Sequence, residues 1–129
     1  MNVKLNVAVA ESVFNAEWSE GCLFYAEEGQ DDLYYAGTQE NGVIFWCGPD
    51  FSGNMTDAWL VVDEMRRRGF RVAIESHDQD GFWFVAIWRD TPSYGQEDAS
   101  GFDRSVPVAI CKAALAAVGH PFDERGDAE

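Results

Sequence analysis

Apolar residues at three- and four-residue spacing predict three helices along the chain. In the middle helix, Asn54 can cap the first turn, residues 66–68 place three arginines in the last turn, and Gly69 can take the left-handed conformation that ends the helix. Its predicted apolar stripe consists of Ala58, Trp59, Val62 and Met65. The same spacing predicts a first helix over residues 3–14 and a third that begins after the cap Ser105.

Alternating apolar and polar residues predict strands after the middle helix. Residues 70–75 alternate with period two, and the polar turn 76–81 joins them to an aromatic run over residues 82–88, which together predict a β-hairpin. Both faces of the second strand are apolar, so we expect it to be central in its sheet or sandwiched between helices. Residues 90–104 contain proline, glycine and acids, and predict a long loop.

The segment 17–48 consists of short aromatic runs separated by turn-forming residues, which leaves open whether it forms short strands or an elaborated loop. Taken with the helices, the pattern predicts an α+β protein with a small antiparallel sheet and helices packed on it. We expect one domain over residues 1–122, followed by a frayed acidic tail at 123–129.

Composition narrows the class of protein. With 129 residues, of which 47% are hydrophobic, the chain can form a proper core. Its three cysteines, Cys22, Cys47 and Cys111, have no CxxC pairing and no metal-ligand spacing, so we expect buried free thiols in a reducing cytoplasm. No apolar run is long enough to cross a bilayer, and no secretory signal opens the sequence.

Charge is the most unusual property of the chain. The chain has nine basic and 23 acidic residues, which gives a net charge of -14. No lysine or arginine occurs between Leu5 and Met65, although this stretch contains many acids: Glu11, Glu17, Glu20, Glu27, Glu28, Asp31, Asp32, Glu40, Asp50, Asp57, Asp63 and Glu64. Such a surface repels nucleic acid and anionic membranes and attracts a basic partner. The alternative is that the acids serve solubility alone.

Motifs for catalysis and metal binding are weak. His77 lies near two aspartates, which can form a metal or base site, but no second histidine or cysteine has ligand spacing, and a solvated turn explains the pattern. The run 78–81 begins like a calcium loop, but lacks the glutamate that a calcium loop needs at its twelfth position. Without a nucleotide-binding or hydrolase motif, we expect a protein that is not an enzyme and needs no cofactor or metal.

Three segments resemble the family of small phage and prophage proteins that carry a phage ABA sandwich domain. The segments are residues 5–11 followed by Trp18, residues 50–52 leading into 57–65, and residues 106–115. The resemblance implies a layered helix, sheet, helix arrangement and a phage or prophage origin, hence action in the host cytoplasm. It implies no activity and supplies no catalytic residues.

The leading hypothesis is therefore a phage protein that binds a basic, nucleic-acid-handling host protein, as an anti-CRISPR or other anti-defence inhibitor that mimics nucleic acid does. The predicted partner-binding residues are Glu17, Glu20, Glu27, Glu28, Asp31, Asp32, Tyr34, Tyr35 and Glu40. One alternative is a small-ligand module that can form a homo-oligomer and whose pocket between sheet and helices has Trp83 or Trp88 in its wall. The other is an accessory phage protein in which acidity has no binding role.

Overall fold

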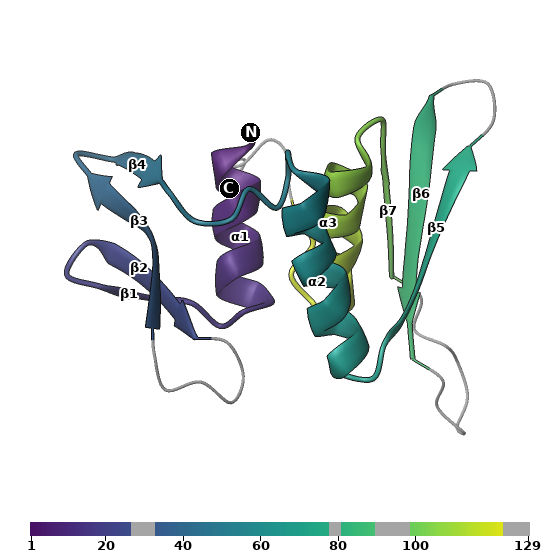
Figure 1. The fold of residues 1–129 in the computed structure, drawn as a ribbon, viewed down its shortest axis with the longest axis horizontal. Coiled ribbons are helices and arrows are strands. Elements are labelled where there is room, and N and C mark those ends of the chain that lie inside the picture. Colours follow the sequence, from purple (N-terminus) through teal and green to yellow (C-terminus); the bar gives the residue numbers. More distant parts are fainter. Residues whose placement is uncertain (27–32, 78–80, 90–98, 123–129) are drawn as a thin grey trace.

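A computed structural model of the chain describes residues 1–26, 33–77, 81–89 and 99–122 (Figure 1). Within these residues the chain forms three helices and seven strands. In chain order they are α1 (Val3–Ser12), β1 (Glu17–Ser19), β2 (Cys22–Ala26), β3 (Leu33–Glu40), β4 (Val43–Trp46), α2 (Met55–Arg67), β5 (Arg71–His77), β6 (Phe82–Trp88), β7 (Ala99–Asp103) and α3 (Val106–Ala117).

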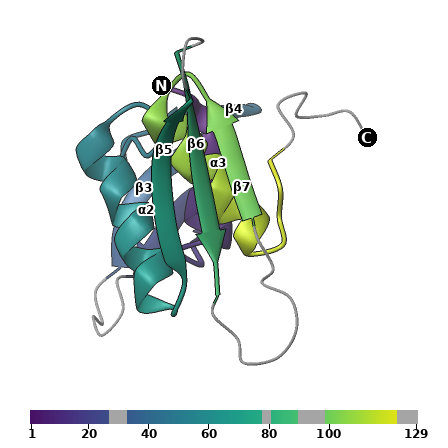
Figure 2. The same cartoon turned by 90° about the vertical axis from the view of Figure 1, so that its right-hand side faces the viewer.

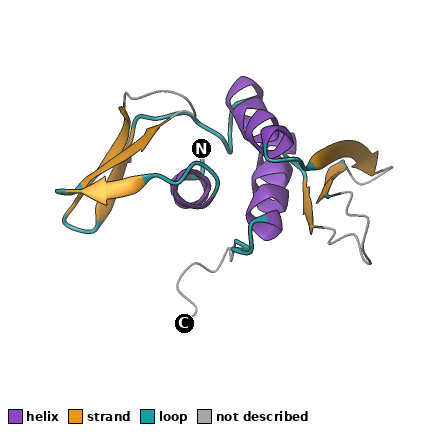
Figure 3. Ribbon diagram, turned by 90° about the horizontal axis from the view of Figure 1, so that it is seen from below, coloured by secondary structure: helices purple, strands orange, loops and turns teal. Residues whose placement is uncertain are grey.

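The elements form layers with the helices inside. One antiparallel sheet has the order β1-β2-β3-β4, and the other has the order β5-β6-β7. Figures 1 and 3 show α1 beside the first sheet, α2 and α3 beside the second, and all three helices between the two sheets. The α+β sandwich is confirmed. It has two sheets where the sequence predicted one, and its helices lie between them, not outside a single sheet.

α2 and α3 begin at the side chains that the sequence predicted as caps. Asn54 Oδ1 accepts a hydrogen bond from the Asp57 amide at 3.1 Å, and Ser105 Oγ accepts one from the Val108 amide at 3.4 Å. Gly69 has a φ of 93°, so α2 ends in the left-handed conformation that glycine tolerates.

The inner face of α2 differs from the predicted stripe. It consists of Ala58, Val61, Val62 and Met65. Trp59 was predicted to lie on it but is 44% exposed, because the buried positions follow a helical period that leaves residue 59 on the flank.

In the described part of residues 17–48 the chain forms the four strands β1 to β4, so short strands are the correct alternative of the two that the sequence left open. Each of the two hairpins turns through a pair of residues with positive φ: Glu20 with Gly21, and Asn41 with Gly42. Two-residue turns of this kind match the natural twist of paired strands. Between Leu23 and Phe24 the register of β2 against β3 shifts by one residue, which marks a bulge at this point of the sheet.

The three-stranded sheet confirms one prediction and corrects two. β6 is the central strand, as expected. β5 extends to His77, which pairs with Phe82 and so belongs to the strand and not to the turn. Residues 99–103 were predicted as loop but form β7: a Cβ on Gly101 would lie 2.1 Å from the Ala109 carbonyl oxygen, so glycine here lets the strand approach α3 closely.

One hydrophobic core joins all the layers. Leu5 and Val9 of α1, Met65 of α2 and Leu115 of α3 are fully buried in it. Val85 and Ile87 extend the core to the three-stranded sheet, and Leu23 and Ala36 extend it to the four-stranded sheet. The outer face of each sheet is left uncovered by helices, as Figure 2 shows for the three-stranded sheet.

Candidate functional site

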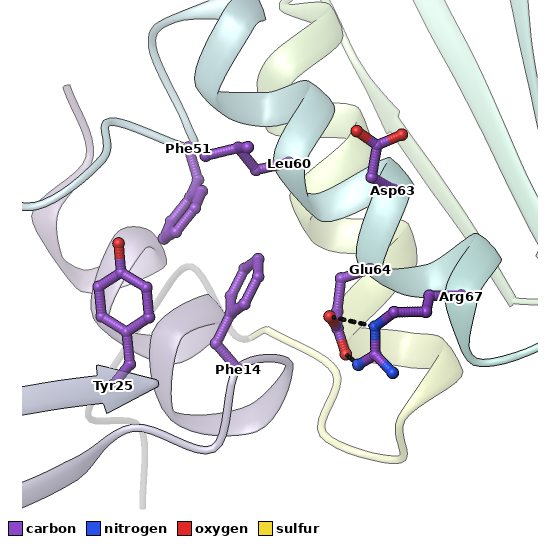
Figure 4. A pocket seen from close by; sticks show the side chains of 7 residues that line it. All are labelled: Phe14, Tyr25, Phe51, Leu60, Asp63, Glu64 and Arg67. Carbon is purple, nitrogen blue, oxygen red and sulfur yellow. Dashed lines mark hydrogen bonds and ion pairs between the residues drawn. The ribbon is translucent and has the colours of Figure 1, made fainter. Parts of the chain in front are cut away.

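A pocket of about 270 Å³ opens between the four-stranded sheet and the helices (Figure 4). It forms where the end of α1, the end of β2, the turn before α2 and the outer side of α2 meet. Its lining residues are Phe14, Tyr25, Phe51, Leu60, Asp63, Glu64 and Arg67.

Aromatic rings form the inner wall of the pocket. Phe14 and Phe51 are stacked, with ring centroids 5.2 Å apart and planes inclined by 12°. Tyr25 is tilted against Phe14 at 6.0 Å. Phe51 is only 1% exposed and also contacts Trp46, with centroids 6.5 Å apart, so the wall is anchored in the core.

The opposite rim comes from α2 and is charged. Glu64 is engaged by two arginines: Arg67 binds its carboxylate, and Arg68 Nε lies 2.8 Å from Glu64 Oε2. Arg68 also donates a hydrogen bond to the Val13 carbonyl, which ties α2 to the end of α1. Asp63 is exposed and has neither a hydrogen bond nor an ion pair within the described part of the chain. The pocket therefore combines aromatic walls with a charged rim.

The segments that carry the family resemblance meet beside this pocket, at the turn before α2. Asn6 is fully buried: its Nδ2 donates to Asp50 Oδ1 at 3.1 Å, and its Oδ1 accepts from the Ser52 amide at 2.9 Å. Cys111 Sγ lies 3.3 Å from the Phe51 carbonyl oxygen. These polar groups satisfy one another inside the fold, so the shared residues hold the turn in place.

The four-stranded sheet brings together several of the predicted partner-binding residues. Glu17 pairs with Phe24, which pairs with Tyr35, so these side chains share the outer face. Glu40 also belongs to this face, opposite Val43. All three predicted residues there are exposed: Glu17, Tyr35 and Glu40.

Two further predicted residues lie elsewhere on the sheet. Glu20 is exposed in the β1–β2 turn. Tyr34 is 39% exposed but pairs with Tyr25, so it lies on the opposite face, toward the pocket. The remaining predicted residues, Glu27, Glu28, Asp31 and Asp32, lie outside the described residues.

Other acids of the lysine- and arginine-free stretch have structural partners. Glu11 accepts a hydrogen bond from Trp18 Nε1 at 2.9 Å, and Asp57 accepts one from the Asp50 amide at 2.9 Å. Asp50 itself belongs to the buried turn, and Glu64 pairs with arginines. The exposed acids of this stretch that have neither a hydrogen bond nor an ion pair within the described residues are thus Glu17, Glu20, Glu40 and Asp63.

A second, mainly basic hollow lies between α2 and the three-stranded sheet, and shares Asp63 and Arg67 with the first pocket. It measures about 810 Å³ and is lined by Asp63, Arg66, Arg67, Phe70, Arg71, Val72 and Trp88. Trp88 pairs with Arg71 across β5 and β6, and Arg89 lies 4.3 Å over the Phe70 ring. Trp88 therefore lines a groove, as the small-ligand hypothesis predicted, whereas Trp83 lies on the other face of β6.

The cysteine thiols and the residues that could bind a metal ion do not form a reactive centre in the described residues. Burial, with a smaller contribution from Asp50, raises the pKa of Cys111 to about 12, so this thiol stays protonated at neutral pH. Cys47 is exposed, which corrects the prediction that all three thiols are buried. In the part of the chain that the structure describes, no cluster of histidine, cysteine, aspartate and glutamate can hold a metal ion. Within the same residues, no helix is long and apolar enough to span a membrane.

The pocket in Figure 4 was not predicted from the sequence. Its walls come from segments that are far apart in the chain, and Phe14, Tyr25 and Phe51 have the composition of core residues. A hint was present in α2, where Leu60, Asp63, Glu64 and Arg67 follow helical spacing on one side of the helix.

These features define a small α+β sandwich protein with a surface pocket and two uncovered sheet faces. The chain belongs to the phage ABA sandwich domain family, whose model matches residues 7–115. Neither a curated protein nor a solved structure matches the chain.

Proposed function

We propose that this phage protein is a non-enzymatic inhibitor or regulator that binds a basic, nucleic-acid-handling host protein through its four-stranded sheet. The observation that carries the proposal is the composition of that sheet. Its strands contain no lysine or arginine, and its outer face combines exposed acids with exposed apolar side chains. The most exposed apolar residues of this face are Phe45 at 58%, Val43 at 53% and Tyr35 at 46%.

Both parts of this composition favour a protein partner. Aromatic side chains on a rigid sheet supply apolar contact area at low entropic cost, and they are enriched among the residues that dominate binding energy. The carboxylates steer a basic surface toward the sheet and repel acidic ones. Proteins that handle nucleic acid carry basic grooves for phosphates, so an acidic sheet of this kind can occupy such a groove in competition with DNA or RNA.

The test is capture of partners from host lysate at low and high salt, with two matched variants. Glu40→Lys reverses one exposed charge on the proposed face, and Glu75→Lys reverses one on the three-stranded sheet. Both change the net charge equally. We expect Glu40→Lys to weaken capture at low salt by roughly threefold to tenfold and Glu75→Lys to leave it unchanged.

Three outcomes would contradict the proposal. Capture of no basic partner at either salt removes it. If both variants weaken capture equally, only the net charge matters. If neither variant changes capture, the protein is an accessory phage protein whose acidity serves solubility.

A second candidate function is the binding of a small anionic aromatic ligand, such as a nucleotide, in the arginine-lined groove. The specific observation in its favour is the juxtaposition of Arg66 and Arg71 with the indole of Trp88. The volume of this groove, about 810 Å³, falls within the range of ~300–1,000 Å³ typical of small-molecule sites. If ATP binds there, it raises the melting temperature, and Arg66→Glu abolishes the shift while Arg104→Glu, at the other end of the sheet, does not.

A further inference from the structure

One edge of the four-stranded sheet is the strand β4, which pairs with β3 on one side only (Figure 1). We propose that β4 binds an extended basic segment of the partner, which joins the sheet as a fifth, antiparallel strand. This inference rests on the proposed function, because it names the part of the basic partner that the sheet receives and the way in which it binds. Strand addition takes its affinity from backbone hydrogen bonds and its specificity from alternate side chains.

β4 differs from the other sheet edges of the described residues in having no feature that protects an edge. Edge strands are usually guarded against pairing by charged side chains, by proline or by being very short. β1 is three residues long and carries Glu17. β5 carries Arg71 and Glu75, and β7 ends at Asp103. β4 consists of four apolar residues, Val43–Trp46, with neither a charge nor a proline, so its edge is open to another strand.

The turn between β3 and β4 determines which backbone groups of β4 are free. It has two residues, 41–42, both with positive φ, and the residues that flank such a turn exchange hydrogen bonds. Because the pattern alternates, Val43 and Phe45 direct their amides and carbonyls toward β3, whereas Ile44 and Trp46 direct theirs away from it. In the described part of the chain, the backbone of these two outward residues bonds to no other element.

The side chains of β4 also favour a strand as the occupant. Val43 and Phe45, on the outer face, are 53% and 58% exposed, although both are apolar. A strand laid against β4 places alternate side chains beside them and removes part of their surface from water. The stem of a lysine or arginine can pack along Phe45, whose ring face attracts the charge at its tip.

Charge favours a basic segment over a second copy of this chain. Glu40 lies opposite Val43 on β3, and the four strands contain no lysine or arginine. Two strand spacings place Glu40 about 10 Å from an added strand, a gap that a lysine and the glutamate span together. A second copy brings the same acids and a net charge of -14. Two four-residue edges by themselves also form too small a contact for the ~1,200 Å² that stable interfaces bury.

A titration with peptides tests the edge without the partner. The full chain is titrated with acetyl-Lys-Val-Lys-Val-Lys-Val-Lys-amide, with its glutamate counterpart and with the form in which the three valine amides are N-methylated. In antiparallel pairing the valines share the inner face with Ile44 and Trp46, so their amides are the ones that face β4. We expect saturable binding of the lysine peptide and at least tenfold weaker binding of the other two. Equal binding of either one, or no binding of the lysine peptide, overturns the proposal.

Amide hydrogen exchange, followed by NMR, locates the bound peptide. When the lysine peptide saturates the protein, exchange at Ile44 and Trp46 should slow at least fivefold. Exchange at Val43 and Phe45 should change little, because these amides are already bonded to β3. Unchanged exchange at Ile44 and Trp46 contradicts strand addition. A dimer that protects these two amides without any peptide, detected by sedimentation velocity, makes a second copy the occupant and also overturns the proposal.

A backbone variant separates strand pairing from general attraction between charges. Ile44→Pro removes one outward amide, and proline is tolerated in an edge strand whose N–H faces solvent. We expect Ile44→Pro to weaken the lysine peptide at least fivefold, whereas the matched variant Ile44→Val keeps the amide and should stay within twofold. Unshifted resonances of the buried Val85 and Ile87 show that the fold persists. Equal affinities of the two folded variants contradict the proposal, and if Ile44→Pro does not fold, exchange in the unmodified protein decides.

The two proposals fail in different ways. If lysate capture finds a basic partner but exchange at Ile44 and Trp46 stays fast in the complex, the edge proposal is wrong and the outer face alone binds the partner. If the lysine peptide slows exchange at these amides but no basic partner is captured at either salt, the edge proposal stands and the proposed function is wrong.

Discussion

The two sheets are built on the same antiparallel principle but differ in charge and in how they join the helices. The three-stranded sheet packs its inner face directly on α3, with Val85 and Ile87 fully buried and Gly101 against the helix backbone. The four-stranded sheet reaches the core through Leu23 and Ala36 and through the aromatic contacts around Phe51, which lies in the turn before α2.

Charge divides along the same line. The four-stranded sheet contains no basic residue, whereas the groove between α2 and the other sheet gathers Arg66, Arg67 and Arg71. Both outer faces carry exposed aromatic side chains, so apolar exposure alone does not indicate which face binds a partner. The strongly acidic net charge is therefore not uniform, and electrostatics distinguishes two otherwise similar sheet faces.

Removing Phe51 should break the connection between the two halves and give the largest effect on stability. Phe51→Ala removes a ring that stacks on Phe14 and contacts Trp46 in the core. We expect a loss of about 3–5 kcal/mol in the free energy of unfolding, measured by urea denaturation. Phe45→Ala serves as the matched control: Phe45 is 58% exposed, so its loss should stay within ~0.5 kcal/mol. Similar losses for both variants would show that Phe51 does not anchor the core.

Adding a side chain at Gly101, between β7 and α3, should have the next largest effect on stability. In Gly101→Ala the new methyl group lies 2.1 Å from the Ala109 carbonyl oxygen and 2.7 Å from the Ala113 nitrogen, both of which belong to the backbone. The strand must move away from the helix, at a cost of about 3 kcal/mol in the free energy of unfolding. Ser100→Ala, on the exposed face of the same strand, is the control and should be neutral. A neutral Gly101→Ala would mean that β7 is not held against α3.

The features that the sequence predicted correctly are local ones. Asn54, Ser105 and Gly69 act within one turn of their own helices, so spacing along the chain is sufficient to identify them. β7 was missed because the role of Gly101 is set by a helix that follows it in the chain and packs across it. Tertiary contacts of this kind leave no periodic signal.

The candidate site divides in the same way. Glu17, Tyr35 and Glu40 were predicted as surface residues from charge and pattern, and the strand register places them on one face. The sequence could not show that Asp50 and Asp57 are used internally, because their partners are set by the turn before α2. It could not show the pocket either, since an aromatic residue in a wall and one in a core look alike in sequence.

Two exposed phenylalanines allow a direct test of which sheet binds the partner. Phe45 is 58% exposed on the four-stranded sheet, and Phe102 is 44% exposed on the three-stranded sheet, where it stacks on Phe82 at 4.7 Å. We expect Phe45→Ala to reduce affinity for the captured partner by about tenfold, which corresponds to ~1.4 kcal/mol, mainly through faster dissociation. Phe102→Ala should leave affinity unchanged in the same surface plasmon resonance assay. The reverse result would assign binding to the three-stranded sheet.

The smallest expected effect concerns the link between α1 and the first strand of the acidic sheet. Trp18→Phe removes the hydrogen bond from Trp18 Nε1 to Glu11 Oε2, which measures 2.9 Å and lies near the surface. A hydrogen bond to a charged group in this setting contributes about 1 kcal/mol, so the urea midpoint should fall slightly with an unchanged slope. Glu11→Gln in the Trp18→Phe background provides the control: with the indole gone, the second substitution should cost almost nothing further. If the two losses add in full, the bond does not hold β1 to α1, and the acidic sheet depends on its aromatic contacts alone.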